Sequence, residues 1–299
     1  MVFVSGCPSC REENPPQAAF CRRCGAALSS LTAGPAGGPA PAHGRLRGWL
    51  VALIAVVLVV AAGAAVAFVV LNREPAAPTP LSWTTIGSSV EGRPIEAASF
   101  GTGTSRRVLL IGGVHGGEYG ARAAKQLAVY LHAHPETVPA GATIDIIRCL
   151  NPDADAAGTR GNAHGVDLNR NMPTANWRRR LSARDQSRSM FHCSGGASAG
   201  SEPEVKVLLA QLGKGYDSVL SLHSHGGFFD ANGPGGRSLA RRMSAVCGLK
   251  LDKVAYDASI TGSLGQYIPE KHGIPIVTVE LKKPHLSQRM IEALLVPAQ

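Results

Sequence analysis

From about Leu81 onward, the sequence predicts an α/β fold with a largely parallel or mixed sheet. Three observations support this fold class. Short apolar runs alternate with longer amphipathic segments, glycine-rich turns separate them, and polar residues follow the ends of several apolar runs. Alternating strands and helices are typical of sheets that carry helices on their faces. We therefore expect residues 81–299 to form one folded domain.

The expected elements follow in order along this domain. Buried strands are predicted at 107–112, 143–148, 218–222 and 274–280, where short apolar runs occur. Helices are predicted at 121–133, 202–212 and 286–295, where apolar residues recur at roughly helical spacing. Ligands bind beyond the carboxyl ends of the strands in such sheets, so polar residues at those ends are candidate site residues.

An uncharged apolar segment, residues 48–71, precedes the domain. As a helix, its 24 residues would extend over roughly 36 Å, enough for the hydrocarbon core of a bilayer. A buried core helix is the alternative, although core helices usually carry a polar stripe. The segment starts late and is long for a signal peptide, so we expect an uncleaved transmembrane helix, with cleavage left open by small residues at 61–65.

Charges on either side of this segment predict its orientation. Arg45 and Arg47 lie just before it, whereas Arg73 after it is offset by Glu74. The positive-inside rule therefore predicts a single-pass membrane protein with a cytoplasmic N-terminus and an extracytoplasmic C-terminal domain. Residues 31–47, rich in Ala, Gly and Pro, and the shorter stretch 72–80 are predicted as flexible linkers.

Residues 1–30 contain two CxxC pairs, Cys7 with Cys10 and Cys21 with Cys24. Each short turn directs two thiolates to one point, so the two turns together suit a tetrahedral structural zinc. The alternative is a pair of disulfides, which a cytoplasmic location disfavours. The segment has too little apolar material to fold alone, and it resembles the short zinc ribbons at the N-termini of many bacterial membrane proteins. The partner of this ribbon is not predicted.

Three residues at predicted strand ends suggest a second metal site. His115 and Glu118 follow the strand at 107–112, and His223 follows the strand at 218–222. Two histidines and a glutamate give the open three-ligand arrangement of a catalytic zinc, although HxxE alone occurs by chance and a lone histidine is more often structural. Glu280 closes the last predicted strand, where a buried carboxylate either pairs with a cation or acts on a water at the zinc.

The segment between these positions carries the most distinctive pattern. It contains Asn151-Pro-Asp153, then Arg160, then Asp167-Leu-Asn169-Arg170-Asn171. Together with HxxE, a later histidine and a late glutamate, this ordered set resembles the zinc metallocarboxypeptidase family (funnelins), in particular its small bacterial branch that acts on murein peptides. The match extends over nearly all of residues 100–285. The resemblance implies a three-layer sandwich with a mixed central sheet and a zinc-dependent carboxypeptidase.

The resemblance also implies how the catalytic zinc is held and used. His115, Glu118 and His223 would be its ligands. Asp167 would accept the second ring proton of His115 and fix its tautomer. Glu280 would be the general base that takes a proton from the attacking water.

Further roles implied by the resemblance concern the substrate. Arg160 would stabilise the oxyanion that forms at the scissile carbonyl. Asn169 and Arg170 would bind the terminal carboxylate, because a planar guanidinium offers a two-pronged match to it. Tyr256 would close over the substrate, with Tyr267 as a competing candidate.

Charge gives weaker information about the substrate. The chain has 30 Lys and Arg against 21 Asp and Glu, a net charge of +9. A basic domain at an anionic cell surface is consistent with wall polymer nearby. The basic segment 177–180, with Arg184 and Arg188, is either a solvated loop or a reader of an additional substrate carboxylate. A nucleic-acid partner is disfavoured, because no binding motif or aromatic interleaving is present.

We therefore expect a membrane-anchored zinc carboxypeptidase that acts on a peptide with a free terminal carboxylate. The expected substrate is a murein peptide from which diaminopimelate is removed from D-glutamate. A general extracellular exopeptidase is the alternative within the same chemistry. A non-catalytic peptide receptor signalling through the zinc ribbon is a third reading, which the intact ligands and Glu280 disfavour. At most one disulfide is expected among three remaining cysteines, Cys149, Cys193 and Cys247.

Overall fold

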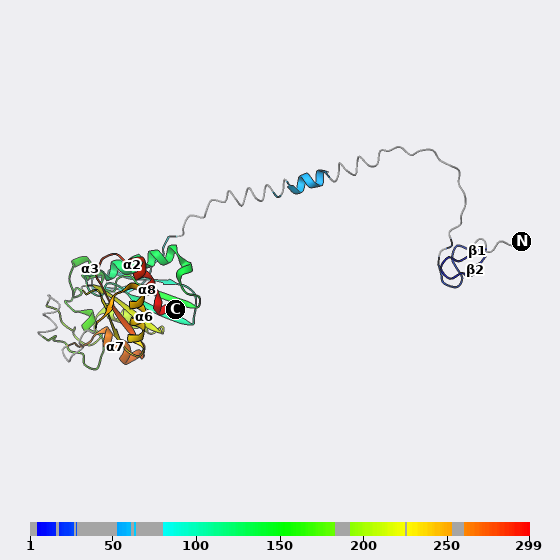
Figure 1. Cartoon of the computed structure of the whole chain (residues 1–299). Helices are drawn as coiled ribbons and strands as arrows, with labels where there is room; N and C mark the ends of the chain where they lie inside the picture. The colour runs from blue at the N-terminus through cyan, green and yellow to red at the C-terminus, as the bar shows by residue number, and fades with distance from the viewer. Residues whose placement is uncertain are drawn as a thin grey trace. The chain divides into compact units, whose positions relative to one another are not determined.

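The computed structural model describes residues 5–15, 18–26, 28, 53–60, 63, 80–182, 192–224, 226–252 and 260–299. The chain divides into two compact units, Met1–Ala77 and Pro78–Gln299 (Figure 1). In the first unit, β1 (Ser5–Gly6) pairs antiparallel with β2 (Glu13–Asn14). These short strands flank the first CxxC turn, Cys7–Cys10, and the second turn, Cys21–Cys24, follows β2.

The predicted membrane segment, residues 48–71, lies mostly outside the described residues. Residues 53–60 within it are helical and exposed. Within the described part of the chain, no helix is both long and apolar enough to cross a bilayer. The predicted linker 31–47, and most of the linker 72–80, also lie outside the described residues.

An eight-stranded mixed sheet forms the centre of the second unit, in the order β3-β4-β6-β5-β7-β10-β8-β9. Four central strands run parallel to one another, namely β6 (Ala142–Ile147), β5 (Arg106–Ile111), β7 (Ser218–Ser224) and β10 (Ile276–Leu281). Four outer strands complete the sheet, namely β3 (Thr84–Ser88), β4 (Pro94–Phe100), β8 (Phe228–Asn232) and β9 (Lys250–Leu251). The pairs β3–β4, β4–β6 and β8–β10 are antiparallel, so the prediction of a mixed sheet is confirmed.

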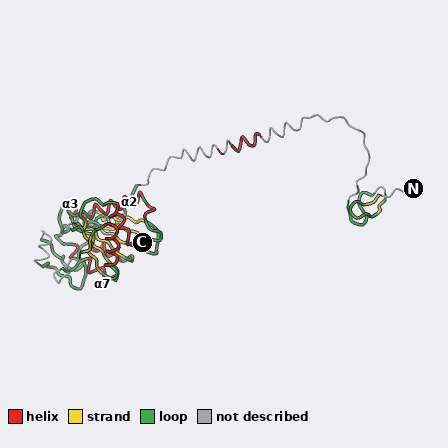
Figure 2. Tube along the Cα trace, in the orientation of Figure 1, coloured by secondary structure: helices red, strands yellow, loops and turns green. Residues whose placement is uncertain are grey.

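Helices cover both faces of this sheet (Figure 2). Successive strand residues point to opposite faces, so Val108 and Leu110 belong to one core cluster and Leu109 and Ile111 to the other. The first cluster includes residues of three helices, α2 (Gly120–Ala133), α6 (Gly236–Cys247) and α8 (Gln288–Leu295). The second includes residues of two, α5 (Pro203–Leu212) and α7 (Leu264–His272). The expected three-layer architecture is therefore present.

The strands and helices predicted within residues 81–299 are all present, with ends shifted by at most two residues. Several elements were not predicted from the sequence. The exposed side of α6 carries arginines, α7 contains Pro269, and β3 is exposed or only partly buried along its length. The short helices were also not predicted, namely α3 (Pro152–Ala157), η1 (Pro135–Thr137), η2 (Leu168–Arg170) and η3 (Val296–Ala298).

Candidate active site

The carboxyl ends of β5, β7 and β10 lie next to one another, because β7 pairs in parallel with both of the other strands. The loop after β5 carries His115 and Glu118, and His223 is the penultimate residue of β7. Glu280 is the penultimate residue of β10 and stands opposite His223 in the register of the two strands. The sheet therefore brings together four residues from three segments that lie far apart in the sequence.

Glycines allow the loop between β5 and α2 to pack tightly against its neighbours. A side chain at Gly116 would begin 1.8 Å from the carbonyl oxygen of Ala154, and one at Gly120 would begin 2.2 Å from that of Leu222. Neither position has room for a Cβ atom. The close approach places the HxxE segment directly over the strand ends.

His115, Glu118 and His223 converge on one point. His115 Nδ1 lies 3.0 Å from Glu118 Oε1, and His223 Nδ1 lies 2.9 Å from Glu118 Oε2. One donor atom from each of the three residues lies within 4.8 Å of the other two. The two histidines are only 3% and 4% exposed, so the cluster is shielded from bulk water.

Asp167 and Arg160 fix the electrostatics of this cluster. Asp167 Oδ1 lies 2.9 Å from His115 Nε2, and its Oδ2 accepts a hydrogen bond of 2.8 Å from Arg160 Nε. Burial opposes ionisation of Asp167, but Arg160 and His115 outweigh it and hold the pKa of Asp167 well below its usual range. Burial and Arg160 lower the pKa of His115, yet Asp167 and Glu118 leave it raised. The carboxylates of Asp167 and Glu118 therefore favour a positive charge at or beside the His115 ring.

These residues fit a zinc ion. Asp167 is ionised and accepts the proton of His115 Nε2, so with a metal bound His115 Nδ1, which lies beside Glu118, would offer its lone pair to the ion. His223 Nδ1 also faces Glu118, while Ser221 Oγ lies 3.0 Å from His223 Nε2. The pKa of Glu118 is lowered despite its burial, because both histidines lie beside it. Two imidazole nitrogens and a carboxylate, with the outer nitrogen of each ring held by a neighbour, form the donor set of a catalytic zinc.

Glu280 lies beside the cluster without belonging to it. Burial raises the pKa of Glu280 to about 7, and the carboxylates of Glu118 and Asp230 oppose its ionisation further. Among the described residues, none donates a hydrogen bond to the Glu280 carboxylate. A carboxyl group with a pKa near neutrality and no hydrogen-bond donor is suited to exchanging protons with a substrate or water.

Asn169 and Arg170 lie on η2, directly after Asp167. The side-chain oxygen of Asn169 accepts a hydrogen bond of 2.8 Å from the backbone N–H of Leu264, which anchors this turn to the start of α7. Arg170 is buried, and its Nη1 donates to the carbonyl oxygen of Asn169 at 2.7 Å. Its positive charge contributes to the low pKa of Asp167, so Arg170 lies on the Asp167 side of the cluster.

Not every predicted residue can be placed. Tyr256 lies outside the described residues, as do Arg184 and Arg188. Tyr267, the competing candidate, is partly buried on α7, and its ring lies 5.7 Å from that of His272. Trp177, in the predicted basic segment, donates from Nε1 to the carbonyl oxygen of Gly195 at 2.9 Å.

A buried polar network that the sequence did not reveal supports the loop between Arg160 and Asp167. Asn162 Nδ2 donates to Glu202 at 2.8 Å and to Glu204 at 3.1 Å, while Asn162 Oδ1 accepts from the backbone of Val166 at 3.1 Å. Burial is the main cause of the raised pKa of Glu204. The only sequence signal was two glutamates flanking Pro203, which was interpreted as a helix start.

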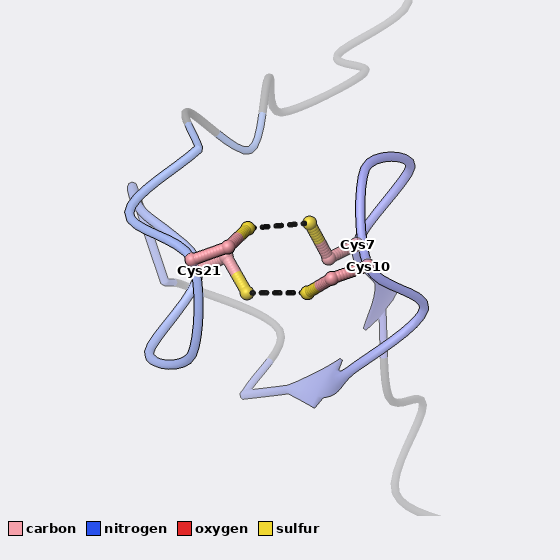
Figure 3. Close-up of side chains that lie close together, drawn as sticks. Cys7, Cys10 and Cys21 are labelled. Carbon is pink, nitrogen blue, oxygen red and sulfur yellow. Dashed lines mark hydrogen bonds between the residues drawn. The ribbon is translucent and has the colours of Figure 1, made fainter.

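The four N-terminal cysteines also converge. The Sγ atoms of Cys7 and Cys24 lie 3.7 Å apart and those of Cys10 and Cys21 lie 3.5 Å apart (Figure 3). Hydrogen bonds from the backbone of Cys24 and Arg23 lower the pKa of Cys21 to about 6, so this thiol is ionised at neutral pH. The remaining cysteines are also free thiols, namely Cys149, Cys193 and Cys247.

Comparison with known proteins agrees with this geometry. Murein peptide amidase A of Vibrio campbellii is 32% identical over 206 residues, which cover 66% of this chain and 78% of that protein. Murein peptide amidase A of Escherichia coli K12 is 33% identical over 129 residues, which cover 41% and 48% of the two chains.

The crystal structure of murein-tripeptide amidase MpaA from Escherichia coli O157 superposes with a TM-score of 0.59. The two sequences are 24% identical, and the superposition covers 75% of this chain and 96% of that one, which shows a shared fold. Residues 72–238 match the Peptidase M14 family, described as zinc carboxypeptidase. This segment contains the His115–Glu118–His223 cluster, Arg160 and Arg170. The chain therefore belongs to the Peptidase M14 family of zinc carboxypeptidases, which are hydrolases of peptide bonds.

Proposed function

We propose that this zinc peptidase removes the terminal residue from murein-derived peptides, cutting the bond between γ-linked D-glutamate and diaminopimelate. The observation that carries the proposal is the convergence of His115, Glu118 and His223 beside the carboxylate of Glu280. The similarity to two murein peptide amidases supports the substrate class.

Zinc held by His115, Glu118 and His223 would supply a Lewis acid that polarises the scissile carbonyl and acidifies a water molecule. Glu280 then accepts a proton from the attacking water and transfers it to the leaving amine. Burial raises the pKa of Glu280 toward the working pH, where a group gains and loses a proton readily.

Arg160 is the proposed electrostatic partner of the developing oxyanion. Its Nε is bound to Asp167, and its Nη1 lies 3.8 Å from Glu118 Oε1, so the guanidinium is fixed at the edge of the cluster. A donor that is already oriented stabilises charge formed during the reaction without reorganising.

Asn169 and Arg170 are proposed to bind the terminal carboxylate of the substrate. The contact with Leu264 fixes Asn169 through its oxygen, which leaves its amide N–H groups as donors. The neighbouring guanidinium adds the planar donor geometry that matches a carboxylate. This pair restricts the proposed enzyme to chain ends.

The test is cleavage of defined peptides by the full chain loaded with zinc. The substrates are L-Ala-γ-D-Glu-diaminopimelate, the same peptide with its terminal carboxylate amidated, and ordinary L-peptides. Release of diaminopimelate from the free acid alone is expected, with products identified by mass. Trimming of ordinary L-peptides at an equal rate would favour a general exopeptidase. Absence of cleavage with zinc bound would contradict a catalytic role.

We further propose that residues 48–71 anchor the peptidase in a membrane, with the N-terminus in the cytoplasm and the catalytic domain outside. The support is the uncharged apolar sequence and the arginines before it. Protease added to whole cells should cleave the C-terminal unit and spare residues 1–30. Protection of the C-terminal unit would overturn this orientation.

The four N-terminal cysteines are proposed to bind a structural zinc in a small ribbon. Their spacing and the ionised thiol of Cys21 support this assignment. Mass spectrometry under native conditions should find a second zinc in the full chain. A disulfide-linked form without that zinc would contradict the assignment.

A further inference from the structure

A small hollow adjoins the active site on the side of β7 and β10. Its volume is about 190 Å³, and it is lined by Tyr119, Ser224, Gly226, Leu281 and Lys282. Four of these residues lie within two positions of Glu118, His223 or Glu280 in the sequence. The hollow therefore lies at the carboxyl ends of β7 and β10, where the pair Ser224–Leu281 follows the pair His223–Glu280 in the strand register.

Lys282 provides the positive charge of this hollow. Its Cβ, Cγ and Cδ atoms lie 3.3–3.6 Å from the point where a side chain at Gly227 would begin, so its stem rests on this glycine. Gly227 has a φ of 71° and donates from its backbone N–H to the carbonyl oxygen of Glu280 at 2.9 Å. Within the described residues, Lys282 has no ion-pair partner, whereas Arg160 is paired with Asp167.

The hollow shares no residue with the turn that carries Asn169 and Arg170. That turn is anchored to Leu264, while the hollow is formed by the ends of β7 and β10 and the residue before α2. In a peptide whose terminal carboxylate binds at Arg170, one residue follows the cleaved bond. The rest of the peptide must leave the site elsewhere, and the hollow beside Glu280 offers the space.

We propose that this hollow is a subsite for the residue on the acyl side of the cleaved bond, and that Lys282 pairs with a free carboxylate on that residue. The inference rests on the proposed function and deepens it. A glutamate linked through its γ-carboxyl keeps its α-carboxylate free, whereas a neutral residue in an ordinary peptide offers no anion there. The subsite thus selects an anionic, γ-linked residue before the cut.

The test compares two substrates that differ only in this carboxylate. They are L-Ala-γ-D-Glu-diaminopimelate and its counterpart in which the D-glutamate α-carboxylate is an amide. With the full chain, Lys282→Gln should lower kcat/KM for the carboxylate substrate about fivefold and leave the amide substrate unchanged. Lys282→Glu should lower it more than about tenfold, because like charges then meet. Lys282→Arg should keep the discrimination.

Lys283→Gln is the matched control, since Lys283 is exposed and does not line the hollow. It should leave both substrates unaffected. Equal losses on both substrates in Lys282→Gln, or equal losses in the Lys283 control, would overturn the subsite and leave the proposed function standing. If the wild-type chain cleaves neither substrate, the proposed function fails and the subsite fails with it.

Discussion

The two cysteine pairs and the His115–Glu118–His223 cluster are both arranged for a metal, but they are held in different ways. The cysteines lie on two turns, and the only strands described beside them are two paired strands of two residues each. The histidine cluster lies at the ends of parallel strands whose side chains are buried on both faces of a sheet. One site has almost no structure besides its ligands, and the other is built onto a complete core.

This difference teaches what each metal does for the protein. Around the cysteines, described residues provide few buried side chains besides Cys7, Cys21 and Asn14, so a metal bound there would supply most of the folding energy. Around His115, Asp167 and Arg160 already hold the ring in place. Zinc there would add chemistry to a site whose side chains the sheet already positions.

Loss of the cysteine site should therefore give the largest effect. Cys21→Ser should unfold residues 1–30, because structural zinc in such small units contributes about 10–16 kcal/mol of binding free energy. Hydrogen exchange of the full chain measures this, and Cys247→Ser is the control. If residues 1–30 of Cys21→Ser stay protected from hydrogen exchange, they fold without the metal. The cysteine site would then depend on its scaffold, as the histidine cluster does.

A change at Glu280 should affect chemistry alone. Glu280→Gln is expected to lower kcat by about 10²–10⁴-fold, because proton transfer is lost while the zinc ligands remain. Zinc content and melting temperature should match those of the wild type and of Glu270→Gln, an exposed control on α7. Retained turnover in Glu280→Gln would remove this residue from the mechanism.

A change at Asp167 measures how far zinc binding at the His115–Glu118–His223 cluster depends on the residues that hold its ligands. Asp167→Asn removes the charge that orients His115, and zinc affinity should fall about 10–100-fold. Competition with a zinc-binding dye measures the affinity, with Asp155→Asn on the surface of α3 as the control. An unchanged zinc affinity would show that the ring needs no such partner.

The pH dependence should be the mildest effect. The pKa of Glu280 is raised to about 7, so its basic form is lost as the pH falls through this value. Bound zinc adds positive charge and lowers this pKa, so kcat/KM should fall about tenfold per pH unit on an acid limb at or below pH 7. A profile of kcat/KM against pH measures this limb, and activity that increases as the pH falls would contradict a carboxylate base.

The sequence was most informative where chemistry and sheet position coincide. The runs around Leu109 and Leu220 are apolar because both faces of those strands are buried, which made the strands and the polar residues after them recognisable. The ordered motifs then identified His115, Glu118 and His223, and the structure brings these three together.

Contacts between distant segments were beyond prediction from the sequence. The support that Asn162 receives from Glu202 and Glu204 depends on a loop meeting the start of a helix about 40 residues later. The raised pKa of Glu280 depends on its burial, and the hollow beside Lys282 exists only once three chain segments meet. These features arise from packing, which no local pattern encodes.

The most direct test of the account measures zinc content and diaminopimelate release together in three forms of the full chain. The wild type should bind two zinc ions and release diaminopimelate from L-Ala-γ-D-Glu-diaminopimelate. Cys21→Ser should bind one zinc ion and remain active, whereas His223→Ala should bind one and lose activity. Activity in His223→Ala, or its loss in Cys21→Ser with one zinc bound, would contradict the assignment of catalysis to the histidine cluster.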